Sequence, residues 1–546
     1  MATNAGVNAP GRVGSGLRHV MTRYDLTMAS WGGVIGSGWL FGAMYSAQYA
    51  GPAATLAWII GGIMVFILAL PFAEMVSAIP EAGGINRYPQ MTHGSLVSST
   101  VSWANWLGYS MTAPIEAEAV TQYAAGYIHG LYLNGSLTSL GLLVAGLLVL
   151  LFFVINYYGV KLFAQVNTWV TTIKVIIPTA TMVLLLIAGF TSGGGKNLAN
   201  PATGGFMPYG MHGVLVAISI GGILFAYSGF RQSLDLAAEG RNPERDVPRA
   251  IVLVLLASLV LYTLLQLAFI VGVSHADLAK GWSGLNFSSP FAQLAVALNL
   301  GVLAAFLYGD AIVSPAGTGL VYTGTTARVL YAIPKNGYGP KSLMKLNSRG
   351  VPRNGMLVAL VIGLLALLPF PAWGFMVGIL SSVAAFTYTM GATSFGALRQ
   401  IAPDMPRKFS LGVHGKWIGP VAFGIGALLL FWSSWPLVGQ VLGVLFIGML
   451  VYLYYLRVNN LPRRDLKAGI WFVCYMVFIL AMSYLGSFGK SRDIIPFPWD
   501  SVVVFFGSMA FYYWGVASAY VTDSLAAFRR GENLDWTDDT QSSAGS

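Results

Sequence analysis

Apolar stretches about 20 residues long recur along the chain from Ser30 to Tyr520, separated by short polar segments. Their spacing predicts about 14 membrane-spanning helices, since each needs about 20 mostly apolar residues. The expected spans are residues 27–50, 53–78, 97–128, 137–157, 163–190, 212–238, 250–273, 292–330, 355–370, 373–398, 417–435, 437–456, 467–487 and 500–520. The long alternation of a membrane β-barrel is absent, which leaves helices as the structure that satisfies its own backbone in lipid. The predicted fold class is an all-α polytopic membrane protein.

The composition supports this interpretation. Of 546 residues, 56% are hydrophobic and only 9% are charged, whereas a soluble domain is about 25% charged. This excludes soluble enzymes, soluble nucleic-acid binders and secreted disulfide scaffolds. The single cysteine, Cys474, lies in an apolar run, so no disulfide can form within the chain.

The basic residues predict the orientation of the spans. Of the 30 Lys and Arg, 24 fall in connecting segments on the same side as the amino terminus. Only four fall on the opposite side, Lys196, Lys280, Lys490 and Arg492, and two lie inside spans. Because cytoplasmic loops carry the excess of Lys and Arg, both termini are expected inside a plasma membrane, the inner membrane in bacteria. The same asymmetry explains the net charge of +10 without a nucleic-acid partner.

Two spans are interrupted by glycines. Residues 32–42 contain five glycines in eleven residues, around Gly36, Ser37 and Gly38, and the sixth span contains Gly221 and Gly222. Close helix packing is one explanation. The other is an unwound segment whose second half-helix, beginning near Gly38, points free N–H groups at an anion. Two interrupted spans lying five spans apart indicate a transporter with inverted repeats and a site at the membrane midplane.

The chain resembles the amino acid–polyamine–organocation transporters, and among them most the bacterial aspartate–proton symporters. The resemblance extends over about residues 30–435 and rests on residues 36–38, 80–84, 239–243 with 246–248, and the 337–352 loop. It implies a five-plus-five inverted repeat, as in the leucine-transporter fold, with about four extra carboxy-terminal helices. The expected division is a cytoplasmic tail (1–23), spans one to six (24–240), spans seven to ten (241–400), spans eleven to fourteen (401–520) and a disordered cytoplasmic tail (521–546).

The resemblance also implies how an amino acid binds. Its α-carboxylate would lie on the N–H groups near Ser37 and Gly38, and its ammonium on the carbonyls of Ile35, Phe225 and Ser228. Phe225 would cap the substrate, although an ordinary core phenylalanine also fits that position. The predicted substrate-binding residues are Ile35, Gly36, Ser37, Gly38, Phe225, Ala226, Ser228 and Arg231.

Arg231 departs from the family pattern, because many relatives carry a glutamate after Gly-Phe in the sixth span. A buried arginine in a span usually faces a partner or a cavity, and its fork matches a carboxylate. We therefore expect a substrate with an anionic side chain, aspartate or glutamate, and not a cationic amino acid or polyamine. The alternative is an internal ion pair of Arg231 with Asp235, Glu116 or Glu118.

Lys174 lies in the middle of the fifth span, too far from either end to reach water by snorkelling. Burial favours the uncharged amine, so this side chain can exchange protons. In several proton-coupled relatives, a lysine on the fifth helix stands where sodium-coupled relatives hold an ion, between helices one and eight. The prediction is proton coupling through Lys174, with Glu116 and Asp310 as further candidates that could equally be structural.

The favoured function is proton-coupled symport of an acidic amino acid by alternating access. An amino-acid exchanger of neutral or acidic substrates without net proton movement remains the alternative. No Walker A loop, His-Glu-x-x-His pair, Gly-x-Ser-x-Gly or metal-spaced cysteine set is present, which disfavours ATP-driven transport and an enzyme. The expected partners are the amino acid, protons and the lipid bilayer, with no cofactor, no metal and no nucleic acid.

Overall fold

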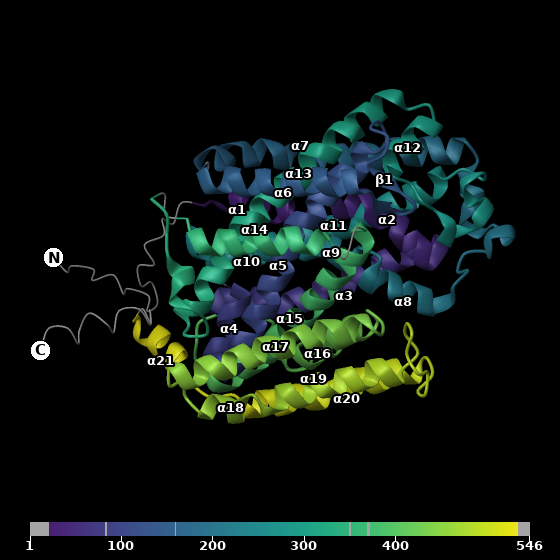
Figure 1. The fold of residues 1–546 in the computed structure, drawn as a ribbon. Coiled ribbons are helices and arrows are strands. Elements are labelled where there is room, and N and C mark those ends of the chain that lie inside the picture. Colours follow the sequence, from purple (N-terminus) through teal and green to yellow (C-terminus); the bar gives the residue numbers. More distant parts are fainter. Residues whose placement is uncertain (1–20, 82–83, 159, 349–350, 369–371, 533–546) are drawn as a thin grey trace, which may run out of the picture.

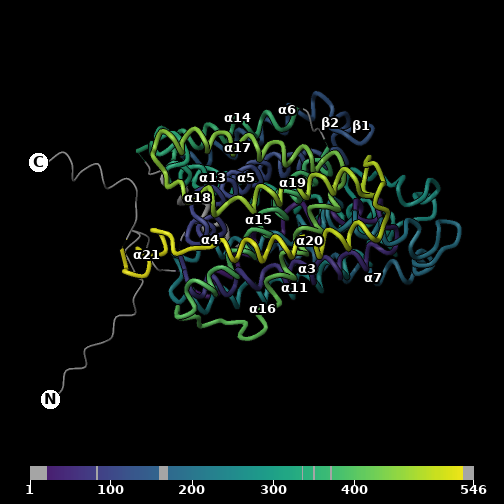
Figure 2. Tube along the Cα trace, turned by 90° about the horizontal axis from the view of Figure 1, so that it is seen from below, coloured from purple at the N-terminus to yellow at the C-terminus, as the bar shows by residue number. Residues whose placement is uncertain are grey.

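The computed structural model is a bundle of long helices that run side by side, with connecting segments gathered at its two ends (Figure 1, Figure 2). The structure describes residues 21–81, 84–158, 160–348, 351–368 and 372–532. The predicted tail up to residue 20, the acidic end from residue 533, and positions 82, 83, 349 and 350 of the family motifs lie outside these residues.

The first five predicted spans coincide with helices. These are α1 (Arg23–Val34) with α2 (Ser37–Ala50), α3 (Ala54–Ala78), α5 (Ser95–Ala124), α6 (Ser139–Tyr158) and α7 (Val160–Thr191). A capping box begins α1, because the hydroxyl of Thr22 accepts from the Asp25 N–H while the Asp25 carboxylate accepts from the Thr22 N–H. The break between α1 and α2 falls at Ile35 and Gly36, within the glycine-rich run.

Spans six to ten begin with the second broken helix. They are α8 (Gly210–Ile220) with α9 (Ile223–Tyr227) and α10 (Gln232–Asp235), α11 (Pro243–Gly272), α12 (Pro290–Ala297) with α13 (Gly301–Lys335), α14 (Arg353–Leu367) and α15 (Trp373–Ile401). The chain bends by 43° at the break between α8 and α9. Gly222 adopts φ +94° there, a left-handed conformation that favours glycine.

The remaining helices form a layer on one side of this core. They are α16 (Gly415–Phe431), α17 (Leu437–Val458), α18 (Arg464–Ala468), α19 (Ile470–Leu485), α20 (Trp499–Ser518) and α21 (Asp523–Arg530). In Figure 1 they lie along the lower edge, where α16 packs on α15 and on α20. Between the spans lie α4 (Gly84–His93), a hairpin of β1 (Tyr132–Leu133) and β2 (Ser136–Leu137), and short 3₁₀ turns. A further 3₁₀ turn, η4 (Ser228–Arg231), joins α9 to α10 within the sixth span.

By length and apolar composition, eight helical segments of the described chain can cross a membrane, or nine if α8 and α9 form one bent span. The helices α5 and α13 are not among them, although both are long. Both carry several of the polar side chains that line the site described below. The less apolar helices are therefore the ones that build the interior of the protein.

The two broken helices run in opposite directions. In Figure 1, the chain passes from left to right through α1 and α2, and from right to left through α8 and α10. Backbone hydrogen bonds join Met21 to Glu239 and Arg241, so the start of α1 lies beside the end of the sixth span. The helix α21 lies at this same end of the bundle (Figure 1), as cytoplasmic placement of both termini requires.

Three sequence-based boundaries are wrong. The third span ends as a helix at Ala124 rather than 128, and the eighth is interrupted between Ala297 and Gly301, where Asn299 adopts φ +58°. The expected disorder from residue 521 fails for α21. The first turn of α21 is capped by the Thr522 hydroxyl, which accepts a hydrogen bond from the Leu525 N–H. The side chain of Leu525 is buried in the core.

Candidate functional site

The first helix break carries a bound carboxylate from the protein itself. The N–H of Ser37, at the amino-terminal end of α2, donates to Oε2 of Glu116 on α5 over 2.9 Å. A helix amino terminus favours negative charge because its first N–H groups have no partner within the helix. Gly36 lets the two groups approach, since a Cβ at this position would lie 2.6 Å from the other Glu116 oxygen.

Lys174 lies on the other side of the same break. Its ammonium Nζ donates to the carbonyl of Gly32 on α1 over 3.2 Å and to Oγ1 of Thr318 on α13 over 2.7 Å. The side chain is 2% exposed. Lys174 therefore joins α7 to α1 and α13, the place between helices one and eight that the sequence comparison indicated.

Hydroxyl groups satisfy the carbonyls that the first break leaves free. Those of Ser314 and Thr318 lie 3.3 and 3.4 Å from the carbonyl oxygen of Ile35, and the Tyr262 hydroxyl donates to the carbonyl of Val34 over 2.8 Å. These freed carbonyls thus find partners on two other helices, α11 and α13, as buried backbone groups generally must.

The two broken helices touch each other through glycines. A Cβ on Gly229 would lie 2.1 Å from backbone atoms of Gly33 and Val34, and a Cβ on Gly38 would lie 3.1 Å from Ala226. These contacts explain Gly33, Gly38 and Gly229 by close packing. Gly36, in contrast, faces a carboxylate, so the packing and the unwound-segment explanations both apply to the glycine-rich run.

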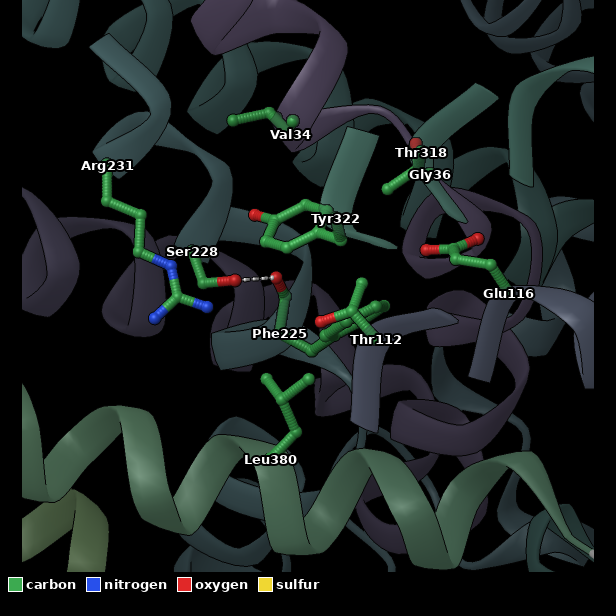
Figure 3. A pocket seen from close by; sticks show the side chains of 11 residues that line it. Val34, Gly36, Thr112, Glu116, Phe225, Ser228, Arg231, Thr318, Tyr322 and Leu380 are labelled. Carbon is green, nitrogen blue, oxygen red and sulfur yellow. Dashed lines mark hydrogen bonds between the residues drawn. The ribbon is translucent and has the colours of Figure 1, made fainter. Parts of the chain in front are cut away.

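A small cavity, with room for about one water molecule, lies between the two breaks (Figure 3). Its lining comes from both broken helices and from α5, α13 and α15. It consists of Gly33, Val34, Gly36, Thr112, Glu116, Phe225, Ser228, Arg231, Thr318, Tyr322 and Leu380. In Figure 3, Glu116 and Arg231 lie on opposite sides of Tyr322, so the cavity has an acidic end and a basic end.

Arg231, at the basic end, is 2% exposed and makes few polar contacts. Its Nη1 donates to Oδ1 of Asn105 over 3.3 Å, its guanidinium carbon lies 4.3 Å from the ring centre of Tyr109, and its Nε has no hydrogen-bond partner. Asp235 instead accepts a hydrogen bond from the Tyr109 hydroxyl. Within the described part of the chain, Arg231 makes no direct ion pair, although Asp235, one of the partners named by the alternative, lies within electrostatic range of it.

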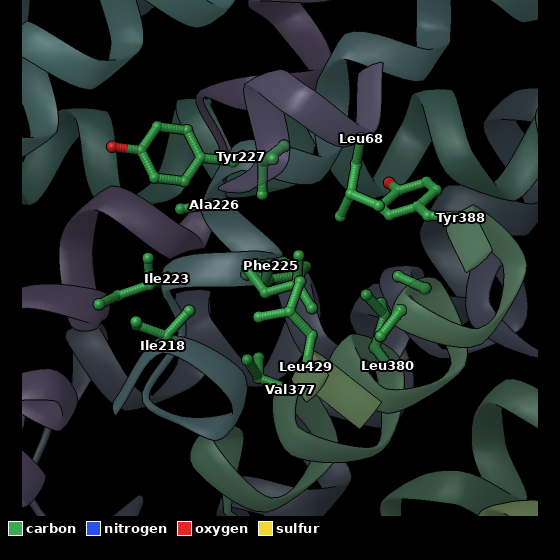
Figure 4. Close-up of a cluster of buried hydrophobic side chains, with 14 of the residues drawn as sticks. Leu68, Ile218, Ile223, Phe225, Ala226, Tyr227, Val377, Leu380, Tyr388 and Leu429 are labelled. Carbon is green, nitrogen blue, oxygen red and sulfur yellow. The ribbon is translucent and has the colours of Figure 1, made fainter. Parts of the chain in front are cut away.

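Phe225 contributes differently through its ring and its backbone. The ring meets Trp373 edge to face, with the centroids 5.9 Å apart, and lies among apolar side chains that include Val377, Leu380 and Leu429 (Figure 4). The carbonyl of Phe225 accepts from the Ser228 hydroxyl over 2.7 Å. Phe225 is therefore a core residue that also lines the cavity, and its capping of a substrate stays a prediction.

The carbonyls predicted to bind an ammonium already have hydroxyl partners. Ile35 and Phe225 are satisfied as described, and the Ser228 carbonyl lies 3.4 Å from the Tyr388 hydroxyl. A carbonyl oxygen has two lone pairs, and those of Ile35 and Phe225 each already meet two donors, so an ammonium would have to displace a hydroxyl at these two carbonyls. Ala226, the remaining predicted contact, lies at the meeting point with Gly38.

Asp310 lies on α13 and is 2% exposed, and within the described residues neither of its carboxylate oxygens has a hydrogen-bond partner. It lies within electrostatic range of Lys174, as does Glu116. The structure thus gathers the three predicted coupling residues from α5, α7 and α13 around the first break.

Several site residues were not predicted. Thr318 shares one face of α13 with Asp310 and Ser314 at four-residue spacing, a signal that could have identified it. Trp373 donates its indole N–H to the Ser37 hydroxyl over 2.9 Å, although 336 residues separate the two. No local sequence pattern indicates that contact or the one between Arg231 and Asn105.

Comparison with known proteins gives consistent matches. The family model of the amino acid permeases matches residues 25–456. The chain is 41% identical to the glutamate/serine transporter AimA of Bacillus subtilis, over 93% of this chain and 95% of that protein. It is 36% identical to the aspartate-proton symporter of the same organism, over 90% of this chain and 95% of that protein. It is 28% identical to the gamma-aminobutyric acid permease of Bacillus subtilis, over 70% of this chain and 80% of that protein.

Proposed function

We propose that this chain, which belongs to the amino acid permease family, couples the entry of an acidic amino acid to the entry of protons. That it is an amino-acid transporter and a multi-pass membrane protein, and not an enzyme, follows from the family and its relatives. The proposal concerns the substrate and the coupling ion. The observation that carries it is the cavity with Glu116 and Arg231 at its opposite ends.

The groups at these two ends match the two carboxylates of a dicarboxylic amino acid. Its α-carboxylate would take the place of the Glu116 carboxylate on the Ser37 N–H, since a helix amino terminus binds either anion. Its side-chain carboxylate would then pair with Arg231, which makes no direct carboxylate contact within the described residues and has an Nε without a hydrogen-bond partner. The printed names of two relatives, a glutamate/serine transporter and an aspartate-proton symporter, support this substrate class.

The same exchange of carboxylates links substrate binding to protonation. When the substrate carboxylate displaces Glu116 from Ser37, two negative charges would share one buried site. Such charges repel strongly in a low dielectric, so protonation of Glu116 favours substrate binding. Lys174, which holds the Gly32 carbonyl and Thr318, would give up or receive that proton as α1 moves relative to α7 and α13. In this scheme a proton and an acidic amino acid bind together.

Purified protein in liposomes without internal amino acid would test this function. An inwardly directed proton gradient is expected to drive accumulation of labelled aspartate or glutamate, with all other amino acids tested as competitors at two pH values. Uptake that needs preloaded amino acid and ignores the gradient would instead establish an exchanger. Competition only by neutral or cationic amino acids would overturn the acidic substrate while leaving amino-acid transport intact.

A further inference from the structure

Glu118 differs from the other buried acids outside the site. It is fully buried, and within the described residues neither of its carboxylate oxygens has a hydrogen-bond partner. Glu74, in contrast, lies 2.9 Å from Arg399 and 3.3 Å from Arg407 and also accepts from the Leu411 N–H. Asp465 accepts from the backbone and hydroxyl of Ser95. These two carboxylates have the partners that an ionised group requires, and Glu118 has none.

Glu118 faces away from the substrate cavity. It follows Glu116 by two residues, about 200° around the helix, so the two carboxyls point to different sides of α5. The titratable groups that interact with Glu118 are Tyr45 of α2 and Tyr132 of β1. Within the described residues, no lysine, arginine or histidine donates a hydrogen bond to either carboxylate oxygen of Glu118. Gln122, one turn further along α5, is also fully buried, with both amide atoms unpartnered.

These neighbours belong to an aromatic lid over the outer side of the cavity, which we define as Phe41, Tyr45 and Trp373. The rings of Tyr45 and Trp373 stack with centroids 5.1 Å apart, and the ring of Phe41 lies 5.3 Å from that of Trp373. The indole N–H of Trp373 donates a hydrogen bond to the Ser37 hydroxyl at the first break. Glu118 lies within electrostatic range of Tyr45, a member of the lid that stands between Ser37 and the end carrying β1 and β2.

An ionised carboxylate without a cation or donors is far more costly to bury than a neutral carboxyl. The closed lid therefore favours protonated Glu118. Opening the lid would let water reach the group and allow the proton to dissociate into it as hydronium, with no other reactant needed. The charge of Glu118 is in this way tied to the position of the lid.

We propose that Glu118 is a second proton-binding site, located beside the aromatic lid and separate from Lys174 and Glu116. This site adds to the proton coupling proposed above, and only its expected effect on transport depends on that proposal. Its protonation with the lid closed is a property of the protein alone. Glu118 is a positioning residue in this account, since it touches neither the substrate cavity nor Lys174.

Infrared difference spectroscopy of the purified protein is the direct test. The protonated-carboxyl C=O absorption of the wild type at neutral pH is expected to lose one component in Glu118→Gln and to keep it, shifted, in Glu118→Asp. Glu532→Gln removes an exposed carboxylate paired with Arg530 and is the matched control, expected to leave this absorption unchanged. An unchanged absorption in Glu118→Gln would overturn the proposal, whatever the transport activity.

Transport gives a second readout. A protonation that binding requires changes the half-saturating substrate concentration by up to about tenfold per pH unit. In Glu118→Gln, the half-saturating substrate concentration is expected to change at least threefold less per unit of external pH than in the wild type. Its dependence on internal pH is expected to stay the same. Loss of the infrared component without proton-driven uptake in the wild type would overturn the coupling function but not the protonation of Glu118. Loss of the infrared component with an unaltered external pH profile would overturn its transport role.

Discussion

The two helix breaks look alike in sequence but differ in what satisfies them. The freed groups of the first break are bound by side chains from α5, α7, α11 and α13, and two of those side chains, Glu116 and Lys174, are ionisable. The second break is satisfied by neutral groups, most of them from the break itself, while the Tyr388 hydroxyl of α15 lies 3.4 Å from the Ser228 carbonyl. The Ala226 N–H donates to the Gly222 carbonyl, and the Ser228 hydroxyl donates to the Phe225 carbonyl.

This difference indicates a division of labour. A break held by ionisable groups on other helices can change its geometry with their charge, because gaining or losing a proton changes which contacts are favourable. A break held by its own neutral groups keeps its shape over a range of pH. We therefore assign proton coupling to the first break and placement of Phe225 and Arg231 to the second. The following substitutions test this assignment, beginning with the largest expected effect.

Gly229→Ala would separate the two breaks. Its Cβ would lie 2.1 Å from backbone atoms of Gly33 and Val34, which cannot yield as a flexible side chain can. Overpacking of this kind costs about 3 kcal/mol or more when backbone must move. We expect little folded protein in size-exclusion and thermal-melting measurements, and no transport. Gly309→Ala is the control, since nothing lies within 4 Å of its Cβ; a normal melting curve for Gly229→Ala would contradict the packing described.

Lys174→Gln would remove the titratable amine at the first break, while the glutamine side chain can still donate hydrogen bonds. We expect gradient-driven accumulation of acidic amino acid to fall at least about tenfold, equivalent to 1.4 kcal/mol of lost coupling. Exchange of internal for external substrate should persist, because the second break and Arg231 are unchanged. Lys196→Gln, in an exposed connecting segment, should behave like the wild type. Undiminished accumulation by Lys174→Gln would remove proton coupling from this residue.

Arg231→Ala would alter the second break's contribution to substrate choice. A hydrogen bond to a charged group contributes about 1.5–3 kcal/mol, so the half-saturating concentration of aspartate or glutamate should rise about 10–100-fold. Transport of serine, if the wild type carries it, should change less than threefold, which makes it an internal control for folding. Arg231→Lys should be intermediate, because it keeps the charge and loses the fork. Equal effects on acidic and neutral substrates would contradict the assigned role.

Thr318→Val should have the smallest effect of the four. It removes the 2.7 Å hydrogen bond to Lys174 but leaves the lysine in place. We expect a shift in the pH dependence of uptake and at most about a tenfold loss of rate. Thr323→Val on the same helix, whose hydroxyl bonds only the local Gly319 carbonyl in the described structure, is the matched control. Identical pH profiles for the two variants would separate Thr318 from coupling.

Local sequence signals predicted most of the fold and part of the site. Glycine density identified both breaks, because few other residues tolerate φ near +90° or a backbone approach near 3 Å. The position of Lys174 within an apolar span indicated an internal role. The contact of Glu116 with Ser37, 79 residues away, depends on helix packing that no local pattern contains.

Composition misled at the carboxy terminus. The polar, acidic end predicted disorder from residue 521, yet Ser524, Leu525 and Ala527 of α21 are buried, and Ser524 and Ala527, three residues apart, share one face of the helix. Hydropathy likewise underrates α5 and α13, since the polar residues that line the site lower their apolar character. In both regions, a few well-placed side chains outweigh the average composition.

Proton movement during substrate entry is the most direct test of the central claim. A pH-sensitive dye trapped inside liposomes would report it after addition of external glutamate or aspartate without a preset pH gradient. The wild type is expected to acidify the interior as the amino acid enters, and Lys174→Gln is expected to admit the amino acid only by exchange, with no acidification. Net substrate entry without acidification in the wild type would contradict proton-coupled symport.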